Sequence, residues 1–295
     1  MRSVLSQSLY YILWPLLLGL CIAGTQVGLA FGHGVLGFNV VYLLLACALA
    51  VLERLLPHEK QWLLGDSQLK PDLAHTLLNK GMVQVIIVVS TVTGLAGRVG
   101  GVSTGLWPQQ WPMFMQVVLG LVVMEFGLYW KHRLAHEKDW LWPFHAVHHS
   151  APRLWFFNTG RFHVVDTVTG LLFGLPLLFA LGAPNEVFSW VAAITAYVGM
   201  LTHCNVEMKF GWLSLVFNTP ELHRWHHSRV LRESNKNYGE NLTLWDHVFG
   251  TYFCAKERRP PANIGISHPM PSDFLGQLRA PFGLLAGRYK VTETV

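Results

Sequence analysis

The chain has 295 residues, of which 52% are hydrophobic and only 13% are charged. This composition excludes an ordinary water-soluble domain, in which about a quarter of the residues are charged, and indicates a membrane protein. The net charge of +5 is not arranged as basic runs interleaved with aromatic residues, so nucleic-acid binding is not expected. Four cysteines without a CxxC motif predict no disulfide framework.

Six apolar stretches predict membrane helices, because a spanning helix needs about 20 mostly apolar residues. In chain order they are residues 9–31, 36–55, 82–96 with their flanks, 111–130, 167–181 and 187–201. The first is expected to be a span and not a cleaved signal, since it is long and a second apolar stretch follows at once. Gly182 to Asn185 predict a tight turn that joins the last two stretches into a helical hairpin.

The distribution of lysine and arginine predicts the orientation in the membrane. With the N-terminus inside and six spans, Arg98 is the single basic residue placed outside. We therefore expect both termini, and the loops after the fourth and sixth spans, on the cytoplasmic side. The positive charge is then explained by this bias and by attraction to anionic headgroups.

Histidines gather in three short motifs, HRLAH, HAVHH and HRWHH, within those cytoplasmic segments. Residues three and four apart share one face of a helix, so each motif directs its imidazoles one way. The residues are His132 and His136, then His145, His148 and His149, then His223, His226 and His227. Imidazole is the commonest metal ligand, and eight ligands exceed the four of a closed zinc site, so two metal ions are predicted. Nitrogen ligands alone leave iron, zinc, copper and nickel open.

The sequence segments around these histidines resemble those of a known family. They are MEFGLYWKHRLAH (124–136), WPFHAVHHS (142–150), NTPELHRWHHS (218–228) and NYGENLTLWDHVFGTY (237–252). Together they resemble the fatty acid hydroxylase superfamily, the membrane-bound di-iron group that includes sterol desaturases, lipid hydroxylases and alkylglycerol monooxygenase. The resemblance extends over about residues 115 to 253.

The resemblance implies a four-helix transmembrane core capped by a histidine-lined centre of two iron ions, which uses dioxygen to attack a lipid C–H bond. Carried over by position, the ligands and catalytic residues are the eight histidines of the three motifs. A ninth, His203 in LTHCN, matches a histidine that the family places at the end of the hairpin's second helix. A buried imidazole at the end of an apolar span also requires a partner on physical grounds.

Other side chains near the motifs have predicted supporting roles. His163, in NTGRFHVVD, is left open between a tenth ligand and a structural residue, with Asp166 placed to orient it. Glu125 is expected to pair with a ligand histidine from behind, and Glu137 to support another ligand, since it points about 100° away from His136. Asp246 is expected to hold the WD turn together.

The electrons for such a reaction must come from outside the chain. The sequence has no haem-attachment CxxCH, no Rossmann glycine fingerprint and no HPGG segment, so a ferredoxin, cytochrome or reductase partner is implied. Two other functions are weighed. A di-zinc membrane hydrolase is disfavoured because HEKDW is not an HExxH motif. A non-catalytic metal-binding membrane protein is disfavoured because the spans are nearly free of histidine.

The expected fold is an all-α integral membrane bundle with a cytoplasmic helical cap that holds two metals. Within one structural unit we expect N-terminal membrane helices over 1–110, a catalytic region over 111–256 and an irregular cytoplasmic tail over 257–295. The lipid substrate, its reacting carbon, and the choice between hydroxylation and desaturation are left open by the sequence.

Overall fold

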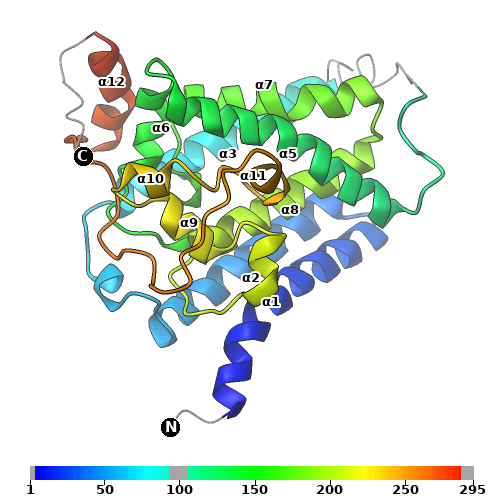
Figure 1. Cartoon of the computed structure of the whole chain (residues 1–295). Coiled ribbons are helices and arrows are strands. Elements are labelled where there is room, and N and C mark those ends of the chain that lie inside the picture. The colour runs from blue at the N-terminus through cyan, green and yellow to red at the C-terminus, as the bar shows by residue number, and fades with distance from the viewer. Residues whose placement is uncertain (1–3, 93–104, 287–295) are drawn as a thin grey trace.

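The computed structural model describes residues 4–92 and 105–286 (Figure 1). These residues form helices joined by loops, with no strand among them and three isolated β-bridges. The all-helical expectation is therefore confirmed.

The first two helices form an antiparallel hairpin. Helix α1 (Val4–Ala30) and α2 (Gly34–Leu55) are joined by a turn in which Gly32 has a φ of 73°. The two helices approach so closely that a Cβ on Gly28 would lie 2.7 Å from the Cα of Gly37. Small residues at such a contact are typical of membrane helix pairs.

Helix α8 (Asn185–His203) packs against α5 (Met113–Glu137) and both helices of the first hairpin, and α7 (Val164–Leu181) packs along α5. A Cβ on Gly127 of α5 would collide with the carbonyl of Phe173 in α7, so these helices pack at backbone distance. The predicted turn between α7 and α8 is present, with Gly182 in the left-handed region at φ 76°. Its amide and the next amide cap the end of α7, which confirms the hairpin.

Four described helices are long and apolar enough to cross a membrane by length and composition, namely α1 from Ser8, α2, α5 and α7. The sixth predicted stretch does form a helix, α8, but α8 is not among these four. It lies inside the protein, packed against α1, α2 and α5, where polar side chains find partners. The Tyr197 hydroxyl, for example, lies 2.6 Å from that of Thr25. A protein-enclosed helix does not have to be apolar on every face.

The third predicted stretch corresponds to α3 (Leu69–Val92), which begins earlier than expected. It is also not among the four candidate spans. Its first turns belong to the cap: Asp72 is 1% exposed and binds Arg161 of a distant loop. Residues 93–96 of that stretch lie outside the described residues, as does Arg98.

The remaining elements form a cap at one end of the bundle (Figure 1). They are η1 (Lys60–Leu63), α6 (Trp142–His149), η2 (Phe156–Gly160), η3 (Gly211–Leu215), α9 (Pro220–His226), α10 (Leu231–Ser234), α11 (Leu244–Val248) and α12 (Phe274–Leu285). The tail is less irregular than expected, because α12 folds against α6, with the Phe282 ring 5.5 Å from that of Phe144. Two short helices, α6 and α9, contain five of the nine predicted ligand histidines, and His227 directly follows α9.

Candidate metal centre

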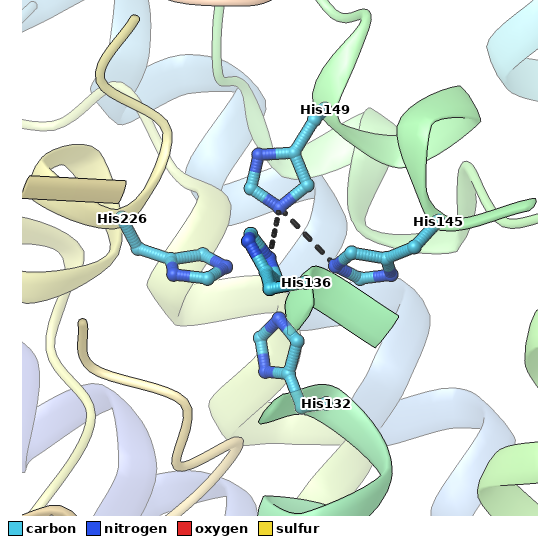
Figure 2. Close-up of side chains that lie close together, drawn as sticks. All are labelled: His132, His136, His145, His149 and His226. Carbon is cyan, nitrogen blue, oxygen red and sulfur yellow. Dashed lines mark hydrogen bonds between the residues drawn. The ribbon is translucent and has the colours of Figure 1, made fainter. Parts of the chain in front are cut away.

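The structure gathers all nine predicted ligand histidines into two groups. The five-histidine group contains His132, His136, His145, His149 and His226 (Figure 2). The four-histidine group contains His148, His203, His223 and His227. Within each group one ring nitrogen of every residue lies within 4.8 Å of the others. The two groups adjoin, since the His149 and His227 rings stack with centroids 4.3 Å apart.

Each HxxHH motif divides its ligands between the two groups. In α6, His145 and His149 are four residues apart and enter the five-histidine group, while His148 enters the other. In α9 and the residue that follows it the assignment is reversed: His223 and His227 enter the four-histidine group, and His226 enters the five-histidine group. The remaining ligands come from the last turns of α5 and from His203, the final residue of α8. Two short helices thus fix the position of one group relative to the other.

Hydrogen bonds at Nδ1 set the ring orientation of six of these histidines. Four Nδ1 atoms face backbone carbonyls, and two face side-chain oxygens. The pairs are His132 with Tyr238 O (2.8 Å), His148 with Arg161 O (3.2 Å), His203 with Gly199 O (2.8 Å), His226 with Lys236 O (2.8 Å), His136 with Asn235 Oδ1 (3.2 Å) and His145 with Asp166 Oδ2 (3.2 Å). Because these oxygens only accept, Nδ1 carries the proton and the Nε2 lone pair is left to face the group.

The Nε2 atoms lie close together but do not carry enough protons for each close pair to form a hydrogen bond. Nε2 of His149 lies 3.1 Å from Nε2 of both His136 and His145, and one N–H cannot satisfy both contacts. Nε2 of His132 and His226 is buried with no hydrogen-bond partner. Leaving such a nitrogen unsatisfied costs about 1–3 kcal/mol. A cation at the centre of each group removes the cost, so the donor sets fit metal ions.

Burial keeps these imidazoles in the neutral form that binds metals. For the ligand candidates outside the membrane helices, removal from water is the largest effect and lowers the pKa, with neighbouring imidazoles adding to it in most cases. The residues are His145, His148, His149, His223 and His227, together with His226, whose pKa falls to about 3. All six are therefore available as ligands near neutral pH.

His163 lies outside both groups. Its Nδ1 accepts the amide N–H of Val165, which caps the start of α7, and its Nε2 donates to the Leu278 carbonyl of α12. With both ring nitrogens engaged, the geometry favours the structural role over ligation. Asp166 does not orient it as expected, since its carboxylate contacts His145 and Lys131 instead.

The predicted roles of Glu125 and Glu137 beside ligand histidines were wrong. Glu125 contacts no histidine and instead accepts backbone N–H groups of Glu240 and Asn241. Glu137 forms an ion pair with Arg133 at 2.8 Å and supports no ligand.

The WD turn has the structure expected of it. The Asp246 carboxylate accepts the amides of Tyr238 and Gly239, both at 2.8 Å. This bonding fixes the loop whose Tyr238 carbonyl faces His132. The sequence analysis does not predict that Asn235 contacts His136 or that Lys131 pairs with Asp166. A lysine directly before His132 in an apolar helix is nevertheless a signal of a functional contact.

Comparison with known proteins agrees with this architecture. Residues 117–251, which include all nine histidines, match the fatty acid hydroxylase family. Ornithine lipid hydroxylase OlsE of Rhizobium tropici is 49% identical over 276 residues, which is 92% of this chain and 83% of that protein. Alkylglycerol monooxygenase of Homo sapiens is 33% identical over 164 residues, 56% of this chain and 35% of the relative.

A probable Delta(7)-sterol 5(6)-desaturase of Neurospora crassa is 27% identical over 158 residues, 51% of this chain and 42% of the relative. No solved structure matches the chain. The chain belongs to the fatty acid hydroxylase family and is an integral membrane oxidoreductase. Its relatives are lipid hydroxylases, monooxygenases and desaturases, which supports a lipid oxygenase with a metal centre.

Proposed function

We propose that this protein is a di-iron oxygenase that hydroxylates a membrane lipid. The observation that carries the proposal is the pair of converging histidine groups. Zinc fits nitrogen ligands equally well but has no redox chemistry, whereas the activation of dioxygen for attack on a C–H bond requires a redox-active metal. This argument favours iron over the di-zinc hydrolase, and family membership disfavours a non-catalytic metal-binding protein.

The nine histidines would hold the two ions, and bound iron would activate dioxygen so that a C–H bond, O₂, two electrons and two protons give an alcohol and water. The chain's own residues supply the surroundings. Eight of the nine histidines are at most 5% exposed, which excludes bulk water from the reacting atoms. Backbone and side-chain acceptors at Nδ1 hold the rings in place while a substrate approaches.

An ornithine lipid is the first substrate to test. The ornithine lipid hydroxylase aligns with 92% of this chain, and this alignment is too long to leave out both N-terminal helices. Alkylglycerol monooxygenase aligns with only 56%. Likeness that extends over most of the membrane helices supports a shared substrate class better than likeness in the metal-binding region alone, since metal ligands do not determine which lipid is bound.

The electron donor is proposed to be a separate one-electron carrier, either a ferredoxin or a cytochrome with its reductase. The cap is proposed to face the cytoplasm, as the positive-inside bias predicts. A reporter fused after residue 295 should then be cytoplasmic, and one inserted between residues 100 and 105 should be external. Finding both reporters on one side would contradict this topology.

The central experiment is metal analysis followed by turnover under ¹⁸O₂. Purified protein in vesicles that contain ornithine lipid, with ferredoxin, ferredoxin reductase and NADPH, should contain two irons per chain and add one ¹⁸O atom to the lipid. His226→Ala should abolish product, whereas His33→Ala, at an exposed turn outside both groups, should not. Two zincs per chain with full activity in the absence of oxygen would reject the proposal in favour of a hydrolase.

A further inference from the structure

A buried ion pair lies where α5, α6 and α7 meet. The Lys131 ammonium is 2.9 Å from one oxygen of Asp166, and the other oxygen is 3.2 Å from Nδ1 of His145. The side chains of Lys131, Asp166 and His145 are only 6%, 3% and 1% exposed. One carboxylate therefore joins a membrane helix to a ligand of the five-histidine group.

Packing does not require this ion pair. Helices α5 and α7 already meet at backbone distance through Gly127, and Leu128 and Met124 fill the space beside Gly174. Removing two charges from water costs several kcal/mol per ion, and apolar residues of similar volume are often as stable in their place. Ionisable side chains within membrane helices are functional candidates for that reason.

The ion pair also makes the two histidine groups unequal. Among the described residues, His145 is the one ligand candidate whose ring nitrogen faces a carboxylate. In the four-histidine group, the partners of His148 and His203 are backbone carbonyls, and Nδ1 of His223 and His227 has no partner. A carboxylate attracts the Nδ1 proton more strongly than a carbonyl does, and so raises the basicity of the opposite nitrogen.

We propose that Asp166 is a positioning residue that makes the Nε2 atom of His145 the strongest electron-pair donor to the metal in the five-histidine group. Lys131 holds the Asp166 carboxylate in place and weakens its attraction for the Nδ1 proton. The metal in the five-histidine group is then bound more tightly, and has a lower reduction potential, than the metal in the four-histidine group. The statement about potential rests on the proposed function, because it requires iron. The statement about affinity holds for any metal.

The test uses the full-length protein with Asp166→Asn alone and combined with Lys131→Met. Asparagine keeps an oxygen to accept from His145 but removes the charge. The double variant also removes the ammonium that the single variant leaves unpaired, so it is the decisive form if the single variant folds poorly. Glu53→Gln is the matched control, since Glu53 is a 4% exposed carboxylate in α2 that binds the amides of Phe156 and Asn205 and contacts no histidine.

We expect both Asp166 variants to release one metal to a chelator with a dissociation constant raised by about 10- to 100-fold, while the second metal stays bound. In ⁵⁷Fe-loaded protein, one of the two Mössbauer signals should change and the potential of that iron should rise. The control should retain both metals and both signals. A folded double variant with both metals and unchanged spectra would overturn the proposal, and so would equal weakening of both metals.

This outcome is independent of the turnover experiment. A protein that proves to bind zinc, and therefore fails as an oxygenase, would still release one metal selectively if the inference about Asp166 is correct. A functional di-iron enzyme with two equally held metals would retain the proposed function and reject the inference.

Discussion

The five-histidine and four-histidine groups differ in how their rings are supported. The first uses side chains as well as backbone, with Asn235 on His136 and Asp166 on His145, and His136 is its most exposed member. The second lies at the end of the buried helix α8, and its hydrogen-bonded members use backbone carbonyls. Side-chain support is replaceable by mutation and backbone support is not, so the five-histidine group is the more tunable of the two.

Removing one ligand from each group tests whether they are separate sites. His148→Ala should lower metal content through the four-histidine group and His226→Ala through the five-histidine group, while both proteins remain inserted in the membrane. Activity should fall by more than the 10- to 100-fold typical of losing an outer partner of a ligand. Metal content per chain measures the result. Retention of two metals in either variant would contradict the grouping.

Replacing His203, the last residue of α8, tests the four-histidine group. His203→Gln keeps size and polarity but supplies a far poorer ligand, so metal content or turnover should fall at least about 10- to 100-fold. The Nε2 atom of His203 lies 3.1 Å from that of His223, which is the contact that a shared metal explains. Activity within about twofold of the parent, small beside that range, would show that His203 is a polar helix end and not a ligand.

The sequence predicts which histidines come together better than it predicts the contacts that each of them makes. Spacing and resemblance together identify all nine histidines that the structure gathers. They do not show that His148 and His226 belong to a different group from the other histidines of their motifs. The periodicity of a motif defines one face of a helix but does not identify the residues that pack against that face. Asp166 was assigned to His163, three residues away, whereas its actual partner His145 comes from another helix. Contacts between elements distant in sequence are not encoded in local patterns.

Membrane spans show the same division between local and tertiary information. Apolar stretches predicted helices at every described position, but α8 is enclosed by protein and α3 begins in the cap. Hydropathy reports the average character of a segment and does not distinguish lipid from protein as its surroundings. The buried Arg161, which pairs with Asp72 and offers its carbonyl to His148, joins α3 to the metal centre.

Acid should destabilise the metal-free protein through both groups. The folded-state pKa of His145, His149 and His226, and of His148, His223 and His227, lies below the unfolded value of about 6.5. The unfolded chain therefore binds more protons below that pH, and stability falls as the pH falls. Each histidine contributes up to about 1.4 kcal/mol per pH unit.

The thermal unfolding midpoint of chelator-treated protein should consequently drop between pH 7.5 and 5.5. His149 and His227 stack on each other, one from each group, so replacing them one at a time tests whether the groups contribute equally: His149→Phe and His227→Phe should each flatten the pH dependence by a similar amount. A midpoint that does not change with pH would show that the metal-free histidines are not buried as neutral rings.

The smallest effect is expected at His163, which lies beside the five-histidine group without joining it. Loss of the side chain that caps α7 should cost about 1 kcal/mol of stability, and loss of the bond to Leu278 should loosen α12 where it covers α6. His163→Asn restores a capping oxygen but does not reach α12 in the same way. We therefore expect His163→Ala to lower the unfolding midpoint, His163→Asn to recover most of it, and both to keep two metals. A collapse of metal content in His163→Asn equal to that in His203→Gln would make His163 a tenth ligand and would end the distinction between the histidines that bind metal and the one that supports them.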